Sequence, residues 1–318
     1  MSDLFKVSQS RIKKWRTCRF AYNVKYIMNL EKQKKPNPLL RGTIIHQMLD
    51  EQTHKRDPWV ALEQAKMRYA GLFEKEREEY GDIPRDIERL MKAYFKWYKK
   101  DPLRFVNIKG RRAEFPFEVE LCKGIVLTGV IDGMARTSDK LKWLVENKSH
   151  KNLPSEGMNY GDIQSMLYTW AAPVYGYPEL DGVCWNYIRY TPPSLPQLLK
   201  NGEMSRKASV RTTWDLYKQA LLDNGLKPKD YQDMQEQLKG KEGEFFIRTY
   251  IPINPKTQKI IVDESIQTAQ EIRRREGVDK TRSMGRHCDW CDAKLLCQED
   301  MRGRSIKSTI KRHYKERE

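Results

Sequence analysis

The spacing of hydrophobic residues changes near residue 100 and separates a helical N-terminal region from a strand-rich region. Before that point, apolar residues recur every three or four positions in four segments, which is the period of an amphipathic α-helix. Ser8 can cap the first of these segments. The predicted helices span residues 11–28, 41–55, 58–80 and 84–100, and a linker containing lysine and proline covers 31–38.

Beyond Pro102 the pattern is typical of strands, because polar and apolar residues alternate or apolar residues form short β-branched runs. Three strands, a helix and a fourth strand follow one another here. A later strand and a long helix come after an insertion that contains two short helical stretches. The predicted strands span 113–121, 125–135, 141–147, 182–190 and 245–254, the predicted helices 159–176 and 255–276, and the insertion 192–244.

This order of elements predicts an α/β fold in which helices pack on a central mixed sheet. We divide the chain into five regions. They are a helical N-terminal region (1–100), a core (101–191), the insertion (192–244), a C-terminal strand, helix and cysteine segment (245–300) and a basic tail (301–318). The sequence contains neither an internal repeat nor the Gly-x-x-x-x-Gly-Lys-Ser/Thr loop of nucleotide-driven motors.

The chain of 318 residues carries a formal net charge of +17, and positive charge is concentrated at its two ends. Residues 1–35 contain ten lysines and arginines against two acidic residues, and residues 301–318 contain seven against two. Such a distribution favours a polyanionic partner. Aromatic residues interleave with the N-terminal cations, which suits single-stranded nucleic acid, although helical packing explains them equally well. Arg11, Lys14 and Arg16 are candidate DNA contacts, and a solubilising or disordered segment is the alternative for the tail.

Nothing in the sequence predicts export or membrane insertion. The N-terminus lacks the apolar stretch of a signal peptide, and no run approaches the roughly 18 apolar residues of a membrane span. Six cysteines in such a chain argue against a disulfide scaffold. We therefore expect a soluble cytoplasmic protein, with Cys122 and Cys184 buried in its core because their neighbours are apolar.

The strand predicted at 141–147 ends in two polar residues, Glu146 and Asn147, and Lys148 follows. Because strand side chains alternate, Glu146 and Lys148 share a face and Asn147 points away. A hairpin with the preceding strand brings Asp132 within one residue of the position opposite Glu146. A one-residue offset or a bulge would then place the two carboxylates together.

Two carboxylates that converge at a strand end suit Mg²⁺ or Mn²⁺, and the backbone carbonyl of Asn147 can add an oxygen. Such a cation polarises a phosphate and lowers the pKa of a bound water. Lys148 can position or deprotonate that water. Each piece alone has a simpler explanation, since Asp-Gly is a common turn dipeptide and Glu-x-Lys a common exposed strand end.

Asp132 and the Glu-Asn-Lys sequence at 146–148 resemble the core motif of the PD-(D/E)XK nuclease superfamily. Two further motifs resemble its RecB-like branch, a Gly-x-x-x-His helix at 42–46 and a Gln-x-x-x-Tyr helix at 164–168. The proline of the superfamily name is absent, because Ile131 precedes the aspartate, and RecB-like members commonly lack that proline.

The resemblance implies a restriction-endonuclease-like core, a central mixed β-sheet flanked by helices. In relatives the histidine is a metal ligand, and the glutamine and tyrosine help to orient the catalytic lysine and the DNA. The residues thus implied in catalysis are Asp132, Glu146, Lys148, Gln164 and Tyr168, and the candidate metal ligands are His46, Asp132, Glu146 and Asn147. Glu114, on an earlier strand, is a further acidic candidate.

Four cysteines form a separate constellation. Cys288 and Cys291 make a C-x₂-C pair, Cys297 follows, and Cys18 lies near the N-terminus. Four thiolates can complete a zinc site or an iron–sulfur cluster, and sequence chemistry alone favours neither. The one-plus-three arrangement resembles iron–sulfur relatives of the RecB-like nucleases, namely the AddB type and exonucleases of CRISPR adaptation or of phages, and implies a [4Fe–4S] cluster in a C-terminal iron–sulfur segment. Zinc, with His287 as an alternative fourth ligand, and the absence of any metal are the other interpretations.

Together these features predict a metal-dependent DNA exonuclease that hydrolyses phosphodiester bonds of single-stranded DNA or DNA ends. It would act in recombination, repair or phage DNA metabolism, in the cytoplasm of a bacterial or phage-infected cell. The alternatives are a non-catalytic DNA-binding or complex-organising subunit and a CRISPR-adaptation processing nuclease. The insertion at 192–244 leaves room for a protein partner, and the sequence sets neither cleavage polarity nor oligomeric state.

Overall fold

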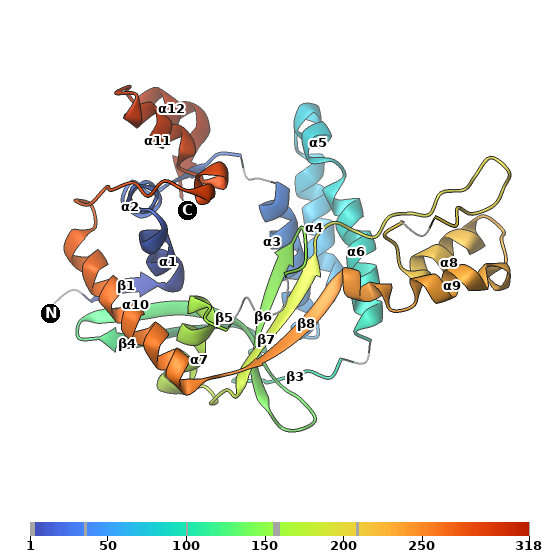
Figure 1. The fold of residues 1–318 in the computed structure, drawn as a ribbon, viewed down its shortest axis with the longest axis horizontal. Coiled ribbons are helices and arrows are strands. Elements are labelled where there is room, and N and C mark those ends of the chain that lie inside the picture. Colours follow the sequence, from blue (N-terminus) through green and yellow to red (C-terminus); the bar gives the residue numbers. More distant parts are fainter. Residues whose placement is uncertain (1–3, 35–36, 100, 155–159, 208–209, 318) are drawn as a thin grey trace.

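A mixed β-sheet lies at the centre of the fold, with helices on both of its faces (Figure 1). The computed structural model of the chain describes residues 4–34, 37–99, 101–154, 160–207 and 210–317. The predicted boundaries at residues 1, 100, 159 and 318 lie outside these ranges, so the predicted and observed elements are compared within them.

Over the described residues, seven strands form the central sheet. They are β1 Phe5–Ser8, β3 Arg104–Phe105, β4 Ala113–Cys122, β5 Ile125–Arg136, β6 Lys142–His150, β7 Gly182–Arg189 and β8 Phe246–Pro252. β5 pairs antiparallel with β4 and β6, β6 parallel with β7, and β7 antiparallel with β8. The predicted mixed sheet and its five predicted strands are therefore confirmed.

Helices bury their apolar stripes against this sheet. One face packs against α1 Gln9–Thr17, α7 Ile163–Tyr175 and α10 Pro255–Arg275, and the other against α3 Asn37–Thr53, α4 Trp59–Ala70 and α6 Ile83–Trp97. Leu144 of β6 and Leu167 of α7 belong to the first core, and Ile188 of β7 and Met48 of α3 to the second. The strict alternation of buried and exposed residues along β4 is the pattern expected of a strand with one solvated face.

The predicted N-terminal helix at 11–28 is not continuous. α1 ends before Cys18, whose backbone is extended (φ −166°, ψ 118°), and α2 Arg19–Tyr22 and a π-helix, η1 Asn23–Ile27, follow. The backbone N–H of Phe20 donates to the carbonyl of Thr281 at 3.1 Å, so a C-terminal segment takes up a donor at the start of α2. β1, which lies in the region predicted as helical, pairs parallel with the start of β5.

Two further predictions require correction. The helix predicted at 58–80 is split at Gly71 into α4 and α5 Glu74–Tyr80, since glycine is a poor helix former. The basic tail is ordered over its described residues. Its strand β9 Tyr314–Glu316 pairs antiparallel with β2 Leu30–Lys32, which comes from the predicted linker. The C-terminal end therefore lies beside residues 30–32 of the N-terminal region.

The insertion projects from one side of the molecule, where α8 and α9 lie away from the sheet (Figure 1). Its helical elements are α8 Trp214–Asp223, η2 Pro228–Tyr231 and α9 Gln232–Leu238, followed by η3 Lys241–Glu244. They enclose a small core of their own that includes Tyr217, Leu221 and Met234. The two short helical stretches predicted here are thus confirmed.

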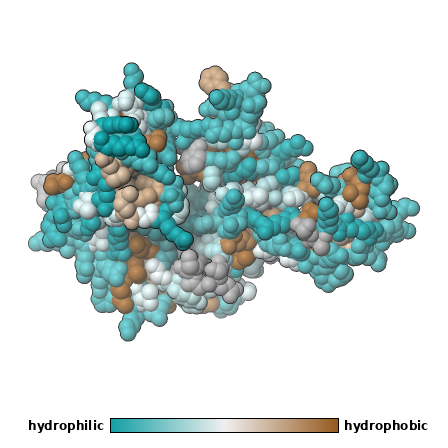
Figure 2. Space-filling view, turned by 45° about the horizontal axis from the view of Figure 1, so that its top comes forward, coloured by the Kyte–Doolittle hydropathy of each residue, from teal (hydrophilic) through white to brown (hydrophobic). Residues whose placement is uncertain are grey.

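The remaining elements are η4 Arg286–Trp290, α11 Lys294–Met301 and α12 Lys307–His313 near the C-terminus. Figure 2 shows a largely hydrophilic face with a hollow between its two halves. Within the described ranges, no helix combines the length and the hydropathy needed to cross a membrane.

Candidate active site

The β5–β6 hairpin brings Asp132 and Glu146 together. Gly133 pairs with Val145, and extending this register by one residue sets Asp132 opposite Glu146. The backbone N–H of Asn147 donates to Asp132 Oδ2 at 3.0 Å. The residue pairs along this hairpin keep one constant register. The hairpin is therefore offset by one residue from the predicted pairing, and no bulge is needed to bring the two carboxylates together.

Glu146, Lys148 and Gln164 form a closed triangle of hydrogen bonds. Lys148 Nζ donates to Glu146 Oε1 at 2.5 Å and to Gln164 Oε1 at 3.2 Å. Gln164 Nε2 donates to the same Glu146 oxygen at 2.6 Å. Gln164 can reach the strand because it lies in the first turn of α7, which Asp162 caps by accepting from the Ser165 N–H.

The protonation of this triangle is set by burial and by its neighbours. Glu146 is only 1% exposed, and burial, together with the nearby Asp132 carboxylate, raises its pKa to about 8. Burial disfavours the charged form of Lys148, but the attraction of Glu146 outweighs it and the pKa of Lys148 is raised. Lys148 is therefore a cation at neutral pH.

His46 approaches the same carboxylates from α3. Its Nδ1 lies 3.9 Å from Asp132 Oδ2, and burial lowers its pKa, which favours the neutral ring that can act as a metal ligand. Gly42, one turn earlier, faces β6 so closely that a Cβ there would lie 2.8 Å from Ser149 Oγ. The Gly-x-x-x-His spacing thus lets the helix approach the strand and places the histidine beside Asp132.

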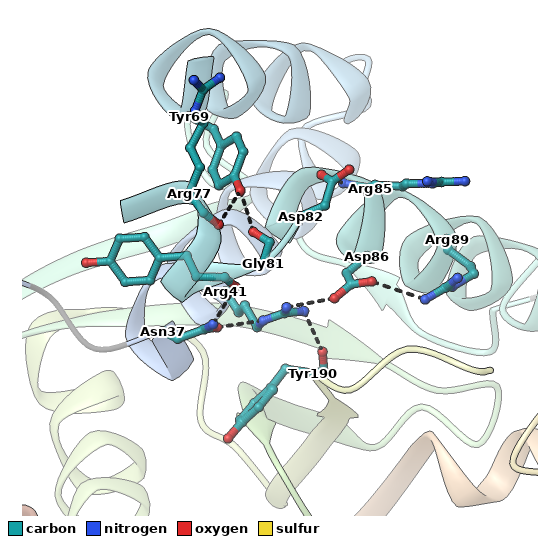
Figure 3. A network of polar contacts seen from close by, with 11 residues as sticks. Asn37, Arg41, Tyr69, Arg77, Gly81, Asp82, Arg85, Asp86, Arg89 and Tyr190 are labelled. Carbon is teal, nitrogen blue, oxygen red and sulfur yellow. Dashed lines mark hydrogen bonds and ion pairs between the residues drawn. The ribbon is translucent and has the colours of Figure 1, made fainter. Parts of the chain in front are cut away.

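A buried arginine fixes the first turn of α3 (Figure 3). Arg41 Nη2 donates to Asp86 of α6 at 2.7 Å, its Nε donates to Asn37 at 2.7 Å, and its Nη1 reaches the carbonyl of Tyr190 at 3.4 Å. Arg89 donates to the other Asp86 oxygen at 3.1 Å. These contacts join α3, α6 and the end of β7, and so hold the helix that carries His46.

A cleft of about 960 Å³ opens beside these residues. Its lining includes His46 and Asp50 from α3, Asn147 and Lys148 from β6, and Glu114 from β4. Lys148 is 31% exposed, whereas Glu146 is buried beneath it. The cleft therefore gives solvent and substrate access to the lysine.

Glu114 occupies a left-handed backbone conformation with φ 52°, which is uncommon for a residue other than glycine. Arg111 Nη1 donates to its carbonyl at 2.6 Å. Burial and the carboxylates of Asp132 and Asp50 raise the pKa of Glu114 to about 7. Glu114 thus lines the acidic side of the cleft, and its part in the active site stays a prediction.

Tyr168 lies one turn beyond Gln164 on α7 but is only 5% exposed. Its ring packs edge-on against Phe117, with centroids 5.0 Å apart, and a Cβ on Gly129 of β5 would lie 2.9 Å from its hydroxyl. The tyrosine therefore supports the strand that carries Asp132 and does not line the cleft.

The side chain of Asn147 points to the opposite face of the sheet, into a network that the sequence did not reveal. Asn186 Nδ2 donates to Asn147 Oδ1 at 2.8 Å, and Asn186 Oδ1 accepts from Arg248 Nε at 3.2 Å. Arg248 in turn forms an ion pair with Asp101 at 2.5 Å. The parallel pairing of β6 with β7 sets Asn147 opposite Asn186, and the antiparallel pairing of β7 with β8 sets Asn186 opposite Arg248. Neither asparagine nor arginine spacing signals these pairings in the sequence.

Cysteines from both ends of the chain meet in one apolar cluster. Cys18 is 7% exposed and belongs to it, and Cys291 and Cys297 pack against it. Burial raises the pKa of the Cys291 thiol, and the neighbouring Cys18 adds to this effect. Cys288 lies in η4 outside this cluster, with its thiol 4.0 Å from the Ser283 carbonyl.

The other two cysteines are expected in the core. Cys184 is fully buried, as predicted, whereas Cys122 is half-buried at the end of β4. Neither belongs to the cluster that contains Cys18.

The candidate DNA contacts of α1 have different surroundings. Arg11 forms an ion pair with Glu276 at 2.6 Å, and Arg16 approaches Glu264 of α10 at 3.5 Å. These contacts tie α1 to the end and middle of α10. Lys14 instead lines a small cavity.

Comparison with known proteins decides the family. A family model described as the PD-(D/E)XK nuclease superfamily matches residues 6–298. The chain belongs to this superfamily. A solved structure, that of SSO0001, aligns over 93% of this chain and 86% of that chain at 10% identity, but its TM-score of 0.33 is too low to add to the assignment. No curated protein matches the chain.

As a PD-(D/E)XK protein, the chain is expected to carry a divalent cation at its carboxylates, and the donor chemistry fits one. Glu146 Oε2 is buried and has no hydrogen-bond partner among the described residues. An unsatisfied buried oxygen is unfavourable, and a cation would satisfy it. No three His, Cys, Asp or Glu side chains of the described residues converge closely enough to enclose a metal. Mg²⁺ commonly uses only one or two protein carboxylates and retains waters, so Asp132 and Glu146 are a sufficient pair.

Proposed function

We propose that this PD-(D/E)XK protein is a metal-dependent exonuclease that hydrolyses phosphodiester bonds of single-stranded DNA or DNA ends. Its pathway would be recombination, repair or phage DNA metabolism. The observation that carries the proposal is the hydrogen-bonded triangle of Glu146, Lys148 and Gln164, set beside Asp132 and next to an open cleft that Lys148 lines. The basic composition of the chain supports a polyanionic substrate.

Asp132 and Glu146 would hold Mg²⁺ or Mn²⁺, with His46 and the carbonyl of Asn147 as further ligands. When bound, such a cation neutralises phosphate charge and lowers the pKa of a coordinated water. Lys148, held as a cation by Glu146, orients the attacking water and stabilises the negative charge that develops on the phosphate.

Hydrolysis forms a bond between the water oxygen and phosphorus and breaks the bond from phosphorus to the leaving oxygen. Because Lys148 is already protonated, the proton lost by the water passes to solvent through the cleft, and the leaving oxygen takes up a proton from solvent water. Gln164 fixes the positions of Lys148 and Glu146 because it forms a hydrogen bond with each of them. Tyr168 acts indirectly, by supporting β5.

We also propose that Cys18, Cys288, Cys291 and Cys297 hold a [4Fe–4S] cluster, with zinc as the alternative. Three of the four thiols share or border one apolar cluster, and thiolates suit either metal centre. As the side chains stand, they do not enclose a metal within the described residues. The role of the cluster would be to join α1 and α2 to the C-terminal segment.

The test is digestion of end-labelled single-stranded and duplex DNA with Mg²⁺ or Mn²⁺, comparing wild type with Lys148→Ala. Lys151, three residues further on and exposed, provides a matched control as Lys151→Ala. We expect wild type and the control to degrade DNA and Lys148→Ala to lose at least about a hundredfold in rate. Blocking each DNA end in turn gives polarity and separates exonuclease from endonuclease action.

Equal cleavage by wild type and Lys148→Ala would refute the catalytic assignment. Absence of cleavage by the metal-loaded wild type would favour the alternative, a DNA-binding or complex-organising subunit. The projecting insertion at 192–244 would then be the first surface to test for a protein partner.

A further inference from the structure

A second cavity, of about 170 Å³, lies beside the catalytic cleft, and five of its 13 lining residues are cations. Its basic residues come from α1, η1, β2, the segment after β2 and the C-terminal end, and they are Lys14, Lys25, Lys32, Lys34 and Arg317. Leu39 and Asp292 line both this cavity and the cleft, so the two spaces adjoin. We call this cavity the lysine pocket.

Few carboxylates neutralise the lysine pocket. Glu31 and Asp292 are the acidic residues in its lining, and Glu31 also forms an ion pair with Lys315 at 3.3 Å. Lys34 pairs with Glu79, outside the pocket. Among the described residues, no carboxylate lies within ion-pair distance of the other three lysines, which are Lys14, Lys25 and Lys32.

Lys25 is the cation most affected by this crowding. Burial lowers its pKa, and repulsion from Lys14 and Arg317 lowers it further, against the smaller opposing effects of Asp292 and Glu31. Arg317 is held in place because its Nη1 donates to the Lys25 carbonyl at 3.0 Å. The positive groups are thus fixed close together by the fold. An anion in the pocket would relieve their repulsion.

The pairing of β2 with β9 explains why the cations converge. This ladder brings the C-terminal end beside η1 and β2, so cations more than 290 residues apart in the sequence face one cavity, as Lys25 and Arg317 do. In Figure 1 the C-terminus lies next to α2. Four lysines and an arginine around a space of this size suit a phosphate, whose oxygens accept charge-assisted hydrogen bonds from several donors.

We propose that the lysine pocket binds a phosphate group of the DNA strand that occupies the catalytic cleft. The identity of the ligand rests on the proposed nuclease function. Because the pocket adjoins the cleft, one strand can place one phosphate near Lys148 and another in the pocket. The pocket then fixes the register of the strand before hydrolysis. A terminal phosphate and an internal phosphodiester are the two sources of this group.

The first test measures binding without catalysis. Fluorescence anisotropy in EDTA gives the Kd of a labelled single-stranded oligonucleotide for wild type and for Lys14→Gln/Lys25→Gln. The control is Lys218→Gln/Lys229→Gln, which removes two exposed lysines that line neither the pocket nor the cleft. We expect the pocket variant to bind about tenfold more weakly, and its plot of log K against log salt to be shallower by about 0.7 for each phosphate that the pocket no longer neutralises.

Oligonucleotides with a 5′-phosphate, a 3′-phosphate or neither distinguish the two sources. If wild type prefers one phosphorylated end and the pocket variant does not, the pocket takes a terminal phosphate. If the variant weakens all three equally, the pocket takes an internal phosphodiester. Affinity equal to that of the control variant overturns the proposal.

A second test uses wild type alone and so does not depend on a variant that folds. Lysine acetylation is followed by mass spectrometry with and without the oligonucleotide or inorganic phosphate. Bound phosphate groups should protect Lys14 and Lys25 several-fold and leave Lys218 unchanged. Equal labelling of all three overturns the proposal. If Lys14 and Lys25 are protected in a protein that never cleaves DNA, the phosphate site is supported and the nuclease function is refuted. The failure of one proposal can therefore be told from the failure of the other.

Discussion

Gly42 of α3 and Ser149 of β6 lie in direct contact, and a Cβ on the glycine would come within 2.8 Å of the serine Oγ. This contact sets the distance between the helix and the strand that carries Glu146 and Lys148. One turn beyond Gly42, His46 lies beside Asp132. A change at Gly42 should therefore act on the active site through the position of the whole helix.

We expect Gly42→Val to reduce DNA cleavage by about tenfold or more, because displacement of a ligand by even about 1 Å costs activity. Overpacking against β6 should also lower the free energy of unfolding by about 1–3 kcal/mol. Steady-state cleavage and thermal denaturation measure the two effects. Gly42→Ala should be milder, and Gly42→Ala/Ser149→Ala should recover activity because it removes the clashing oxygen. Full activity in Gly42→Val would mean that α3 is free to shift without consequence.

The buried Glu146 should make the stability of the metal-free protein depend on pH. Its pKa is raised from 4.5 to about 8, so the folded protein binds the proton more tightly than the unfolded chain. The stability contributed by this proton is fully present below pH 4.5 and is lost as the pH rises through about 8. The amide of Glu146→Gln does not titrate. In EDTA the melting temperature of wild type should therefore fall relative to the variant between acidic and alkaline pH, by on the order of 5 °C.

Added Mg²⁺ supplies the control for this prediction. A cation beside Glu146 favours the carboxylate, so it should raise the melting temperature of wild type at alkaline pH and have little effect on Glu146→Gln. Parallel curves for the two proteins across the pH range would show that Glu146 is not desolvated in solution.

Much of this site could be predicted because its signals are local. Alternation in 113–121 and the apolar runs at 125–135 and 141–147 identify the three strands. A hairpin of adjacent strands has few registers, so Asp132 and Glu146 could be paired to within one residue. The helices that carry His46 and Gln164 are also clear from their periodicity.

Two of the errors concern contacts between distant segments. The helix predicted over 11–28 breaks at Cys18, where the chain meets the segment around Thr281. The tail pairs with β2 although its own pattern shows only charge. The helix or strand propensity of a short stretch of sequence cannot reveal either contact, because pairing with a distant segment overrides the local preference.

Asn186 should position the catalytic strand from the opposite face of the sheet. It is 2% exposed, and its amide bonds to Asn147, Arg248 and Tyr94. Asn186→Ala leaves buried polar groups without partners and should destabilise the fold by about 2–4 kcal/mol. It should also lower kcat for DNA, measured where the variant remains folded, with little change in KM. The exposed Asn224 is a control, because its amide bonds only locally, to the Ala220 carbonyl at 2.8 Å, and Asn224→Ala should cost no more than about 1 kcal/mol. An unchanged kcat in Asn186→Ala would show that this hydrogen-bond network stabilises the fold but does not affect catalysis.

The proposed metal centre of the cysteines can be tested by colour and by metal content. A [4Fe–4S] cluster absorbs in the visible range, and zinc does not. We expect Cys291→Ala to lose visible absorbance, bound iron and soluble yield together, because Cys291 and Cys18 would join the two ends of the chain. Cys184→Ala is the matched control, since Cys184 is buried in a separate core against the sheet and its substitution should retain the full iron content. Zinc in place of iron in wild type would select the alternative metal. A Cys291→Ala protein that keeps its colour and stability would remove Cys291 from the ligand set.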